Sequence, residues 1–93
     1  MNRIEEIKRR LAVLSPTQLN LIDDSAKHAG HAGAQHGGHY QLMIVSEAFA
    51  GKLPIARHRM VYTELDDLMQ NGIHALNIQA YTPQEFSTTQ HKE

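Results

Sequence analysis

The sequence contains no cysteine and no tryptophan, and its aromatic residues are two Phe and three Tyr. The absence of cysteine excludes a disulfide scaffold, a thiolate nucleophile and any metal cluster held by the chain's own thiolates. No apolar run approaches the ~20 residues that a membrane helix needs. The N-terminal residues are charged and periodic, unlike a signal peptide. We therefore expect a soluble, cytoplasmic protein.

A strong charge of either sign is also missing, since nine basic residues face ten acidic ones and the net charge is -1. A nonspecific nucleic-acid binder normally carries a basic excess. The length of 93 residues predicts one domain with a thin core, which excludes a large enzyme with a deep active site. No nucleophile elbow, phosphate-binding loop or H-E-x-x-H motif is present, and Asp23 and Asp24 are typical turn formers. We expect no enzymatic activity.

Hydrophobic periodicity predicts an α+β order. Helices are expected over 2–14, over 54–70 with a break near Ala56 as an alternative, and from Thr82 onward; strands are expected over 19–24, 40–46 and 73–81. Gly72 is expected to end the second helix in a left-handed conformation. Thr82, Pro83 and Glu85 form a capping pattern for the last helix. The prediction is a two-layer domain over 1–86, a three-stranded sheet with helices on one face, followed by a polar tail over 87–93.

The chain is rich in histidine, with seven residues, four of them in the spacing H-x2-H-x4-H-x2-H: His28, His31, His36 and His39. Segment 25–38 contains no apolar residue larger than alanine, so we expect a long loop, and loops of this length are usually functional or disordered. Neutral imidazole is the commonest metal ligand. The histidines therefore fit a solvated loop that binds metals adventitiously, an all-histidine zinc site, or a single loop ligand that works with a residue elsewhere.

His74 is the candidate partner outside the loop. Strand alternation gives it the parity of Leu76, Ile78 and Ala80, which places it on the core side near the start of its strand. A histidine in that position is also a common structural hydrogen-bonding residue. Spacing alone does not establish that the loop and this strand start lie at the same end of the sheet.

A basic cluster opens the long helix: Lys52, Arg57, His58 and Arg59. Cations at a helix N-terminus oppose the helix dipole, which favours either ion pairing or a function. Phosphate contact by a helix in a groove is one interpretation. Salt bridges with Glu64, Asp66 or Asp67 are the structural alternative.

Several of these residues, taken in order, resemble the BolA family. Asp23-Asp24-Ser25 before a histidine-bearing loop is similar to the family's D-[ED]-S-x-x-H, and His39-Tyr40 stands where the family has His-Phe. The remaining matches are Val45-Ser46, Phe49-x-Gly51, Arg57-His58-Arg59 with Val61-Tyr62, and Ile73-His74-Ala75-Leu76 before Thr82-Pro83. The resemblance covers roughly residues 4–86. Each piece is weak alone, but the ordered set is specific.

The resemblance implies a class II KH-like fold (α-β-β-α-α-β-α) and a non-enzymatic adaptor that binds a monothiol glutaredoxin. In such a complex a 2Fe-2S cluster is shared, with a cysteine and glutathione supplied by the glutaredoxin and imidazoles supplied by the BolA protein. Carried onto this sequence, the ligands are His74 and His28, with His31, His36 and His39 as alternatives to His28. The implied role is iron-sulfur or iron homeostasis, or stress regulation. Alone, the chain is expected to be a monomer or a weak dimer.

The family also includes DNA-binding transcriptional regulators, which gives an alternative function for the helix starting near Arg57. Ordinary KH-type RNA binding is not expected, because Gly51 is followed by Lys52-Leu53-Pro54 and the G-x-x-G motif is missing. The two hypotheses require different residues. Cluster ligation needs His74 and a loop histidine, whereas DNA binding needs the arginines and weakens steeply with salt.

Overall fold

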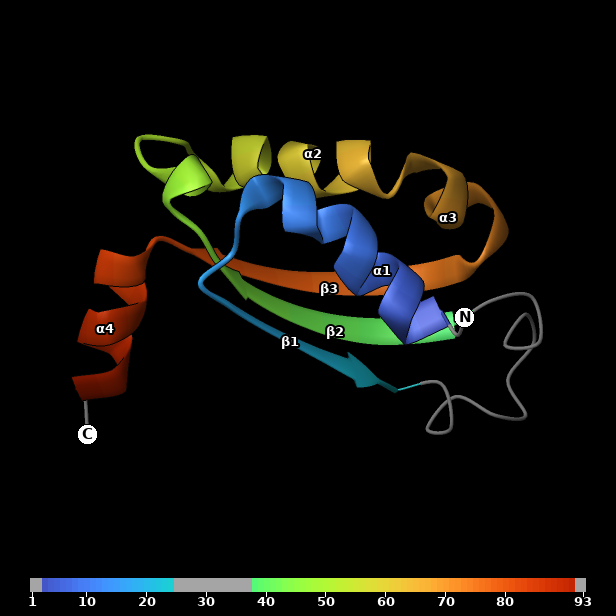
Figure 1. The fold of residues 1–93 in the computed structure, drawn as a ribbon, viewed down its shortest axis with the longest axis horizontal. Helices are drawn as coiled ribbons and strands as arrows, with labels where there is room; N and C mark the ends of the chain where they lie inside the picture. Colours follow the sequence, from blue (N-terminus) through green and yellow to red (C-terminus); the bar gives the residue numbers. More distant parts are fainter. Residues whose placement is uncertain (1–2, 25–37, 92–93) are drawn as a thin grey trace.

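The computed structural model describes residues 3–24 and 38–91. Along the chain the elements are α1 (Arg3–Leu11), the 3-10 turn η1 (Ala12–Leu14), β1 (Gln18–Asp23), β2 (Gly38–Val45), η4 (Glu47–Phe49), α2 (Pro54–Glu64), α3 (Asp66–Asn71), β3 (Ile73–Tyr81) and α4 (Pro83–His91). Figure 1 shows α1, α2 and α3 on one side of the sheet, while α4 lies beyond the sheet's end, away from them. This is the two-layer α+β arrangement that the sequence predicts.

The sheet has the order β1-β2-β3. β1 pairs with β2 antiparallel, and β2 pairs with β3 parallel. A parallel pair requires a crossover connection, and α2 and α3 provide it. Because β2 and β3 are parallel, their first residues lie at one end of the sheet and their last residues at the other.

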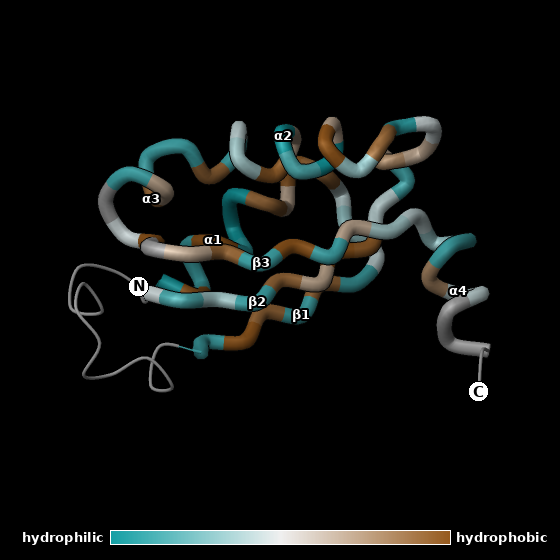
Figure 2. Tube along the Cα trace, turned by 180° about the vertical axis from the view of Figure 1, so that it is seen from behind, coloured by the Kyte–Doolittle hydropathy of each residue, from teal (hydrophilic) through white to brown (hydrophobic). Residues whose placement is uncertain are grey.

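The core lies between the sheet and the helices. Alternate residues of β2 face it, so Tyr40, Leu42 and Ile44 are buried while Gln41 between them is exposed. The helices supply the other half of the core with Ile7, Leu11, Val61 and Leu65, each 0% exposed. The alternation is visible along the strands in Figure 2, where brown and teal segments follow one another. Ile78 continues the pattern in β3, between the exposed Asn77 and Gln79, as predicted.

The helix expected over 54–70 is divided at Leu65, not near Ala56. It is continuous through Ala56 and divides at Leu65, which ends α2 and precedes α3. Leu65 is fully buried, so the change of direction keeps this side chain in the core while the chain turns back toward β3. The break therefore follows from a tertiary contact rather than from a local helix-breaking residue.

Gly72 ends α3 without the left-handed conformation that the sequence predicts, since its φ is −147°. A Cβ at this position would lie 2.6 Å from Nε of Arg3, so the glycine allows the Arg3 side chain to approach closely. Among the glycines that the structure describes, the one with a positive φ is Gly51, at 75°, in the turn before α2.

The loop before β2 and the polar tail are both shorter than expected. Gly38 and His39 belong to β2 rather than to the preceding loop, and α4 continues to His91. Within residues 3–24 and 38–91, no helix is long and apolar enough to cross a membrane.

Candidate functional site

The starts of β2 and β3 meet at one end of the sheet. Gly38 is the Cα partner of Ile73, and its N–H donates to the carbonyl of Gly72 over 3.1 Å. On the other side of β2, the N–H of Asp24 donates to the carbonyl of His39 over 2.7 Å. The chain therefore leaves the sheet after Asp24 and rejoins it at Gly38 beside the start of β3. His28, His31 and His36 lie outside the described residues, but both points that bracket them lie at the end of the sheet where His74 is placed.

The register between β2 and β3 slips at His74. Gly38 pairs with Ile73 and His39 pairs with Ala75, so His74 has no Cα partner in β2. Such a bulge leaves one residue outside the ladder and changes the direction of nearby side chains; bulges are common beside functional sites. The parity argument that placed His74 on the core side assumes unbroken alternation and does not extend across this slip. The side chain of His74 lies outside what the structure describes.

His39 is half-buried beside Asp24 and Gln41. The amide Nε2 of Gln41 donates to Oδ2 of Asp24 over 3.0 Å. A hollow of ≈ 280 Å³ opens here, lined by Asp24, His39, Tyr40, Gln41, Ala75 and Asn77. Among the described residues, no group of three or more His, Asp or Glu side chains could hold a metal ion. Of the four clustered histidines, His39 is the one within the described residues. It lies on β2, next to the start of β3 where His74 is found.

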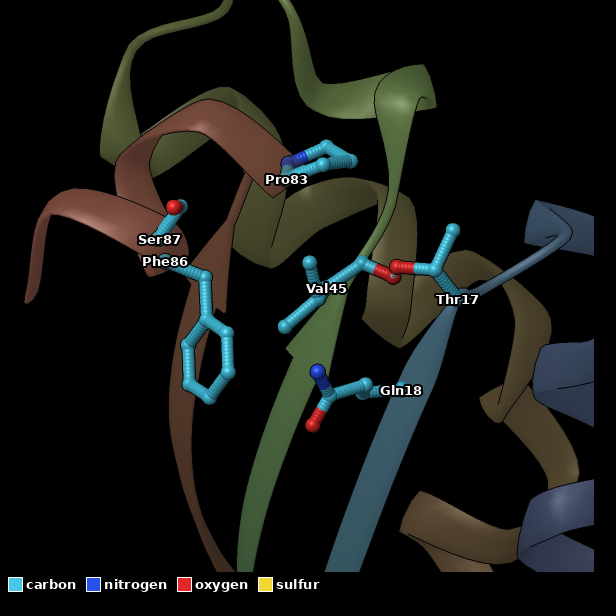
Figure 3. Close-up of a pocket in the computed structure, with 6 residues that line it drawn as sticks. All are labelled: Thr17, Gln18, Val45, Pro83, Phe86 and Ser87. Atoms are coloured by element: carbon cyan, nitrogen blue, oxygen red, sulfur yellow. Dashed lines mark hydrogen bonds between the residues drawn. The ribbon is translucent and has the colours of Figure 1, made fainter. Parts of the chain in front are cut away.

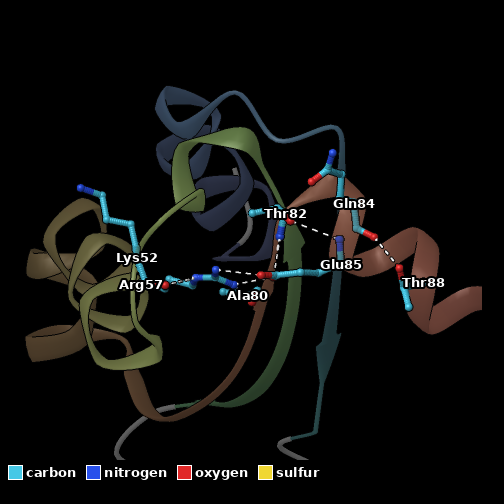
Figure 4. Close-up of polar contacts among 7 residues, drawn as sticks. All are labelled: Lys52, Arg57, Ala80, Thr82, Gln84, Glu85 and Thr88. Atoms are coloured by element: carbon cyan, nitrogen blue, oxygen red, sulfur yellow. Dashed lines mark hydrogen bonds and ion pairs between the residues drawn. The ribbon is translucent and has the colours of Figure 1, made fainter.

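The opposite end of the sheet is organised around Arg57, whose side chain is 11% exposed. Its guanidinium binds Glu85 through two contacts, Nη1 to Oε1 at 2.6 Å and Nη2 to Oε2 at 3.0 Å (Figure 4). It also donates to the carbonyls of Ala80, at 3.1 Å, and Lys52, at 2.9 Å. Its Cζ lies 6.0 Å from the centroid of the Phe49 ring. One side chain thus ties the turn before α2 to the end of β3 and to the first turn of α4.

Glu85 completes a capping box at the start of α4. Its Oε1 accepts from the N–H of Thr82 at 3.0 Å, and its own N–H donates to Oγ1 of Thr82 at 3.2 Å, as the sequence predicts. The Arg57 guanidinium and this backbone bond lower the pKa of Glu85 to about 2. The predicted pairing with Glu64, Asp66 or Asp67 is wrong for Arg57; Asp67 instead pairs with Arg10 over 3.3 Å.

The four basic residues at the start of α2 therefore divide into two kinds. Arg57 is occupied inside the fold, and His58 is half-buried. Lys52 and Arg59 are exposed, and neither forms a side-chain ion pair with another described residue. Any phosphate contact by α2 or the turn before it would depend on these two cations.

The sheet face away from α1–α3 is uncharged at the end near α4. Figure 3 shows a hollow there, with Phe86 on one side and Gln18 on the other. Its volume is ≈ 330 Å³ and its lining residues are Thr17, Gln18, Val45, Pro83, Phe86 and Ser87. No cation lines it, so this hollow lacks the charge that phosphate recognition requires.

Two structural residues at this end were not assigned a role from the sequence. Ser46 is 1% exposed; its Oγ donates to the carbonyl of Leu14 at 2.5 Å and accepts from the N–H of Ala48 at 3.0 Å. The second role of Glu85, as the partner of Arg57, was likewise missed. The capping pattern pointed to Glu85, but no local signal joins it to a residue on α2.

The mixed three-stranded sheet, its parallel β2–β3 pair and the helical crossover define a KH-like α+β domain. A family model described as BolA-like protein matches residues 11–85. The chain belongs to the BolA-like family.

Relatives and solved structures agree with this family. The DNA-binding transcriptional regulator BolA of Escherichia coli (strain K12) is 35% identical over 88 residues, covering 95% of this chain and 80% of that protein. SufE-like protein 1 of Arabidopsis thaliana is 44% identical over 78 residues, covering 77% of this chain but 21% of its own length. The structure of BolA1 from Arabidopsis thaliana matches with a TM-score of 0.81 and 37% identity, over 91% of this chain and 96% of that one. The chain thus spans a small part of some relatives.

Proposed function

We propose that the protein is a non-enzymatic adaptor that binds a monothiol glutaredoxin and shares a bridging 2Fe-2S cluster with it. His74 is one ligand, and a histidine of the preceding segment is the second, with His28 first and His31, His36 and His39 as alternatives. The observation that carries the proposal is the meeting of the two strand starts. The pairing of Gly38 with Ile73 brings both boundaries of segment 25–37 to the end of the sheet that carries His74.

The donor chemistry supports this assignment. The chain has no cysteine, so it offers nitrogen ligands and needs a partner for thiolates. Imidazole is an accepted ligand of a 2Fe-2S cluster and raises its potential relative to all-thiolate ligation. The bulge at His74 removes this residue from the regular ladder, which allows it to change without displacing the paired residues after it. The cluster would supply one-electron or sensing chemistry; the chain's own residues hold it and set its pH dependence, because imidazole must be neutral to bind.

The test is visible absorption and circular dichroism on mixing the protein with a cluster-loaded monothiol glutaredoxin. We expect a changed spectrum that is lost in His74→Ala. Separate His28→Ala, His31→Ala, His36→Ala and His39→Ala variants identify the second ligand. His58→Ala, on α2, is the matched control and should leave the spectrum unchanged. An unchanged cluster spectrum together with no complex on gel filtration would refute the proposal.

A second candidate function is DNA binding, in agreement with the names of the bacterial relatives. Exposed Lys52 and Arg59 favour it. Double substitution Lys52→Ala/Arg59→Ala should weaken binding and lower the slope of log K against log salt by about two, one for each lost phosphate contact. Fluorescence anisotropy with a labelled duplex measures both quantities. His74→Ala should not affect DNA binding, which separates the two functions.

A further inference from the structure

The outer edge of β1 is the feature that neither function uses. Asp24 N–H donates to the carbonyl of His39, and these residues are opposite each other in the continuation of the β1–β2 register. In an antiparallel ladder, hydrogen-bonded pairs recur at every second residue. Gln18, Asn20 and Ile22 therefore direct their backbone groups toward β2. The N–H and C=O groups of Leu19 and Leu21 point to the outer edge.

These outward groups have no partner among the described residues. No hydrogen bond to the backbone of Leu19 or Leu21 exists outside the ladder in the described part of the chain. Proteins usually protect such edges with lysine, proline or a bulge. β1, with the sequence QLNLID, contains no lysine or proline, and its register with β2 is unbroken over all six residues. Ile22 adds an exposed apolar side chain, 49% accessible, on the open face.

We infer that this edge is an interface with a second copy of the chain, in which two β1 strands pair antiparallel about a two-fold axis at Asn20. Leu19 then lies opposite Leu21 of the second copy, and each such pair exchanges two backbone hydrogen bonds. The four outward groups of each copy are all satisfied. The result is a continuous six-stranded sheet with both helical layers on the same side.

Side-chain chemistry selects this occupant and this register. Leu19 and Leu21 are half-buried against the core. In the dimer, the leucines of the second copy cover the part of each side chain that is exposed in the single chain. Asp23, the one charged residue of β1, falls opposite Thr17, so the two carboxylates lie at opposite ends of the interface. A shift that centres the pair on Leu21 would place Asp23 opposite Leu19, and one centred on Leu19 would pair Leu21 with Thr17. The Asn20-centred register is the one of these three that places both leucines opposite leucines.

The cysteine-free chain allows a direct test by Asn20→Cys. The two copies of residue 20 form a non-hydrogen-bonded pair, with Cα atoms about 4.5 Å apart, which a disulfide can span. We expect rapid formation of a covalent dimer under mild oxidation at concentrations where the wild type associates. Asn77→Cys is the matched control, because Asn77 is an exposed asparagine on the same face of the other edge strand. Equal crosslinking of the two variants, or none of Asn20→Cys, would overturn the inference.

Association without crosslinking is measured by sedimentation equilibrium up to millimolar protein. Asn20→Lys places two like charges opposite each other at the axis and should weaken dimerisation about fivefold or more. Asn77→Lys adds the same charge at the opposite edge and should have little effect. A wild type that remains monomeric over the whole range, or a dimer weakened by Asn77→Lys alone, would contradict pairing through β1. The glutaredoxin mixing experiment is independent of these outcomes.

Discussion

The two ends of the sheet are built in opposite ways. At the end where β2 and β3 finish, the polar side chains that we describe are bound to other parts of the fold: Ser46 to the turn after α1, and Arg57 to β3, the turn before α2 and α4. At the end where the same strands begin, the ladder slips and histidines stand on both strands. The first is a closed end, held together by internal contacts, whereas the second carries the candidate histidine ligands.

This contrast assigns different roles to motifs that look equally functional in the sequence. The R-H-R cluster suggests phosphate binding, yet its first arginine is the centre of the closed end. The histidines suggest a mobile loop, yet His39 belongs to a strand and lies next to the bulge at His74. A charged motif is therefore best judged by whether its groups are already bound within the fold.

The largest effect on the closed end should come from Phe49→Ala. Phe49 is 0% exposed, and its removal should lower the free energy of unfolding by about 3–5 kcal/mol. Urea denaturation measures this loss. Val13→Ala, at a residue 64% exposed, is the control and should cost less than about 0.5 kcal/mol. Comparable losses for the two variants would show that this end is not the packed one.

Ser46→Ala should have the next largest effect. It leaves the carbonyl of Leu14 and the N–H of Ala48 without their partner, at a cost of about 1–3 kcal/mol in unfolding free energy. Backbone chemical shifts of Asp24 and His39, at the other end, should stay unchanged. Shifts that move at both ends would mean that the ends are coupled.

Arg57→Lys keeps the charge but removes the two-contact geometry with Glu85. We expect a loss of about 1 kcal/mol, because Glu85 is 46% exposed and water screens part of the interaction. Thermal unfolding measures it, and Arg59→Lys is the matched control on the same helix. A DNA affinity that falls for Arg57→Lys with no change in stability would instead support a binding role.

The smallest effect should be the acid dependence caused by Glu85. Its pKa is lowered in the folded state, so its contribution to stability is complete above pH ~4.5 and is lost as the pH falls toward 2. With its exposure taken into account, the contribution is about 1 kcal/mol or less. Denaturation of Glu85→Gln between pH 2 and 5 should show a weaker pH dependence than the wild type. Glu64→Gln serves as the control, and an equal reduction there would argue against Glu85 as the source.

Much of the fold could be predicted because its signals are local. The apolar run of β2, the alternation of Ile78 with Asn77 and Gln79, and the capping box of Thr82 and Glu85 each depend on neighbouring residues, and the structure confirms them. The ion pair of Glu6 with Arg10, four residues apart on α1, is of the same local kind, with Nε of Arg10 2.8 Å from Oε2 of Glu6.

What the sequence did not reveal depends on residues that meet only after folding. Arg57 and Glu85 are 28 positions apart, so no periodicity connects them. The break at Leu65 follows from burial in the core, and the bulge at His74 follows from how β3 docks on β2. The same limit applies to the site: its histidines were visible, but their common end of the sheet was not. The identity of the second histidine ligand stays a prediction.

Folding must also bring β2 and β3 together across a long stretch of chain. Gly38 and Ile73 are far apart along the chain, and contacts of long sequence separation form slowly because a large loop must close first. The positions of His39 and His74 therefore become neighbours only when this loop has closed. The juxtaposition of His39 and His74 thus depends on the β2–β3 pairing, and a chain in which this pairing has not formed lacks it.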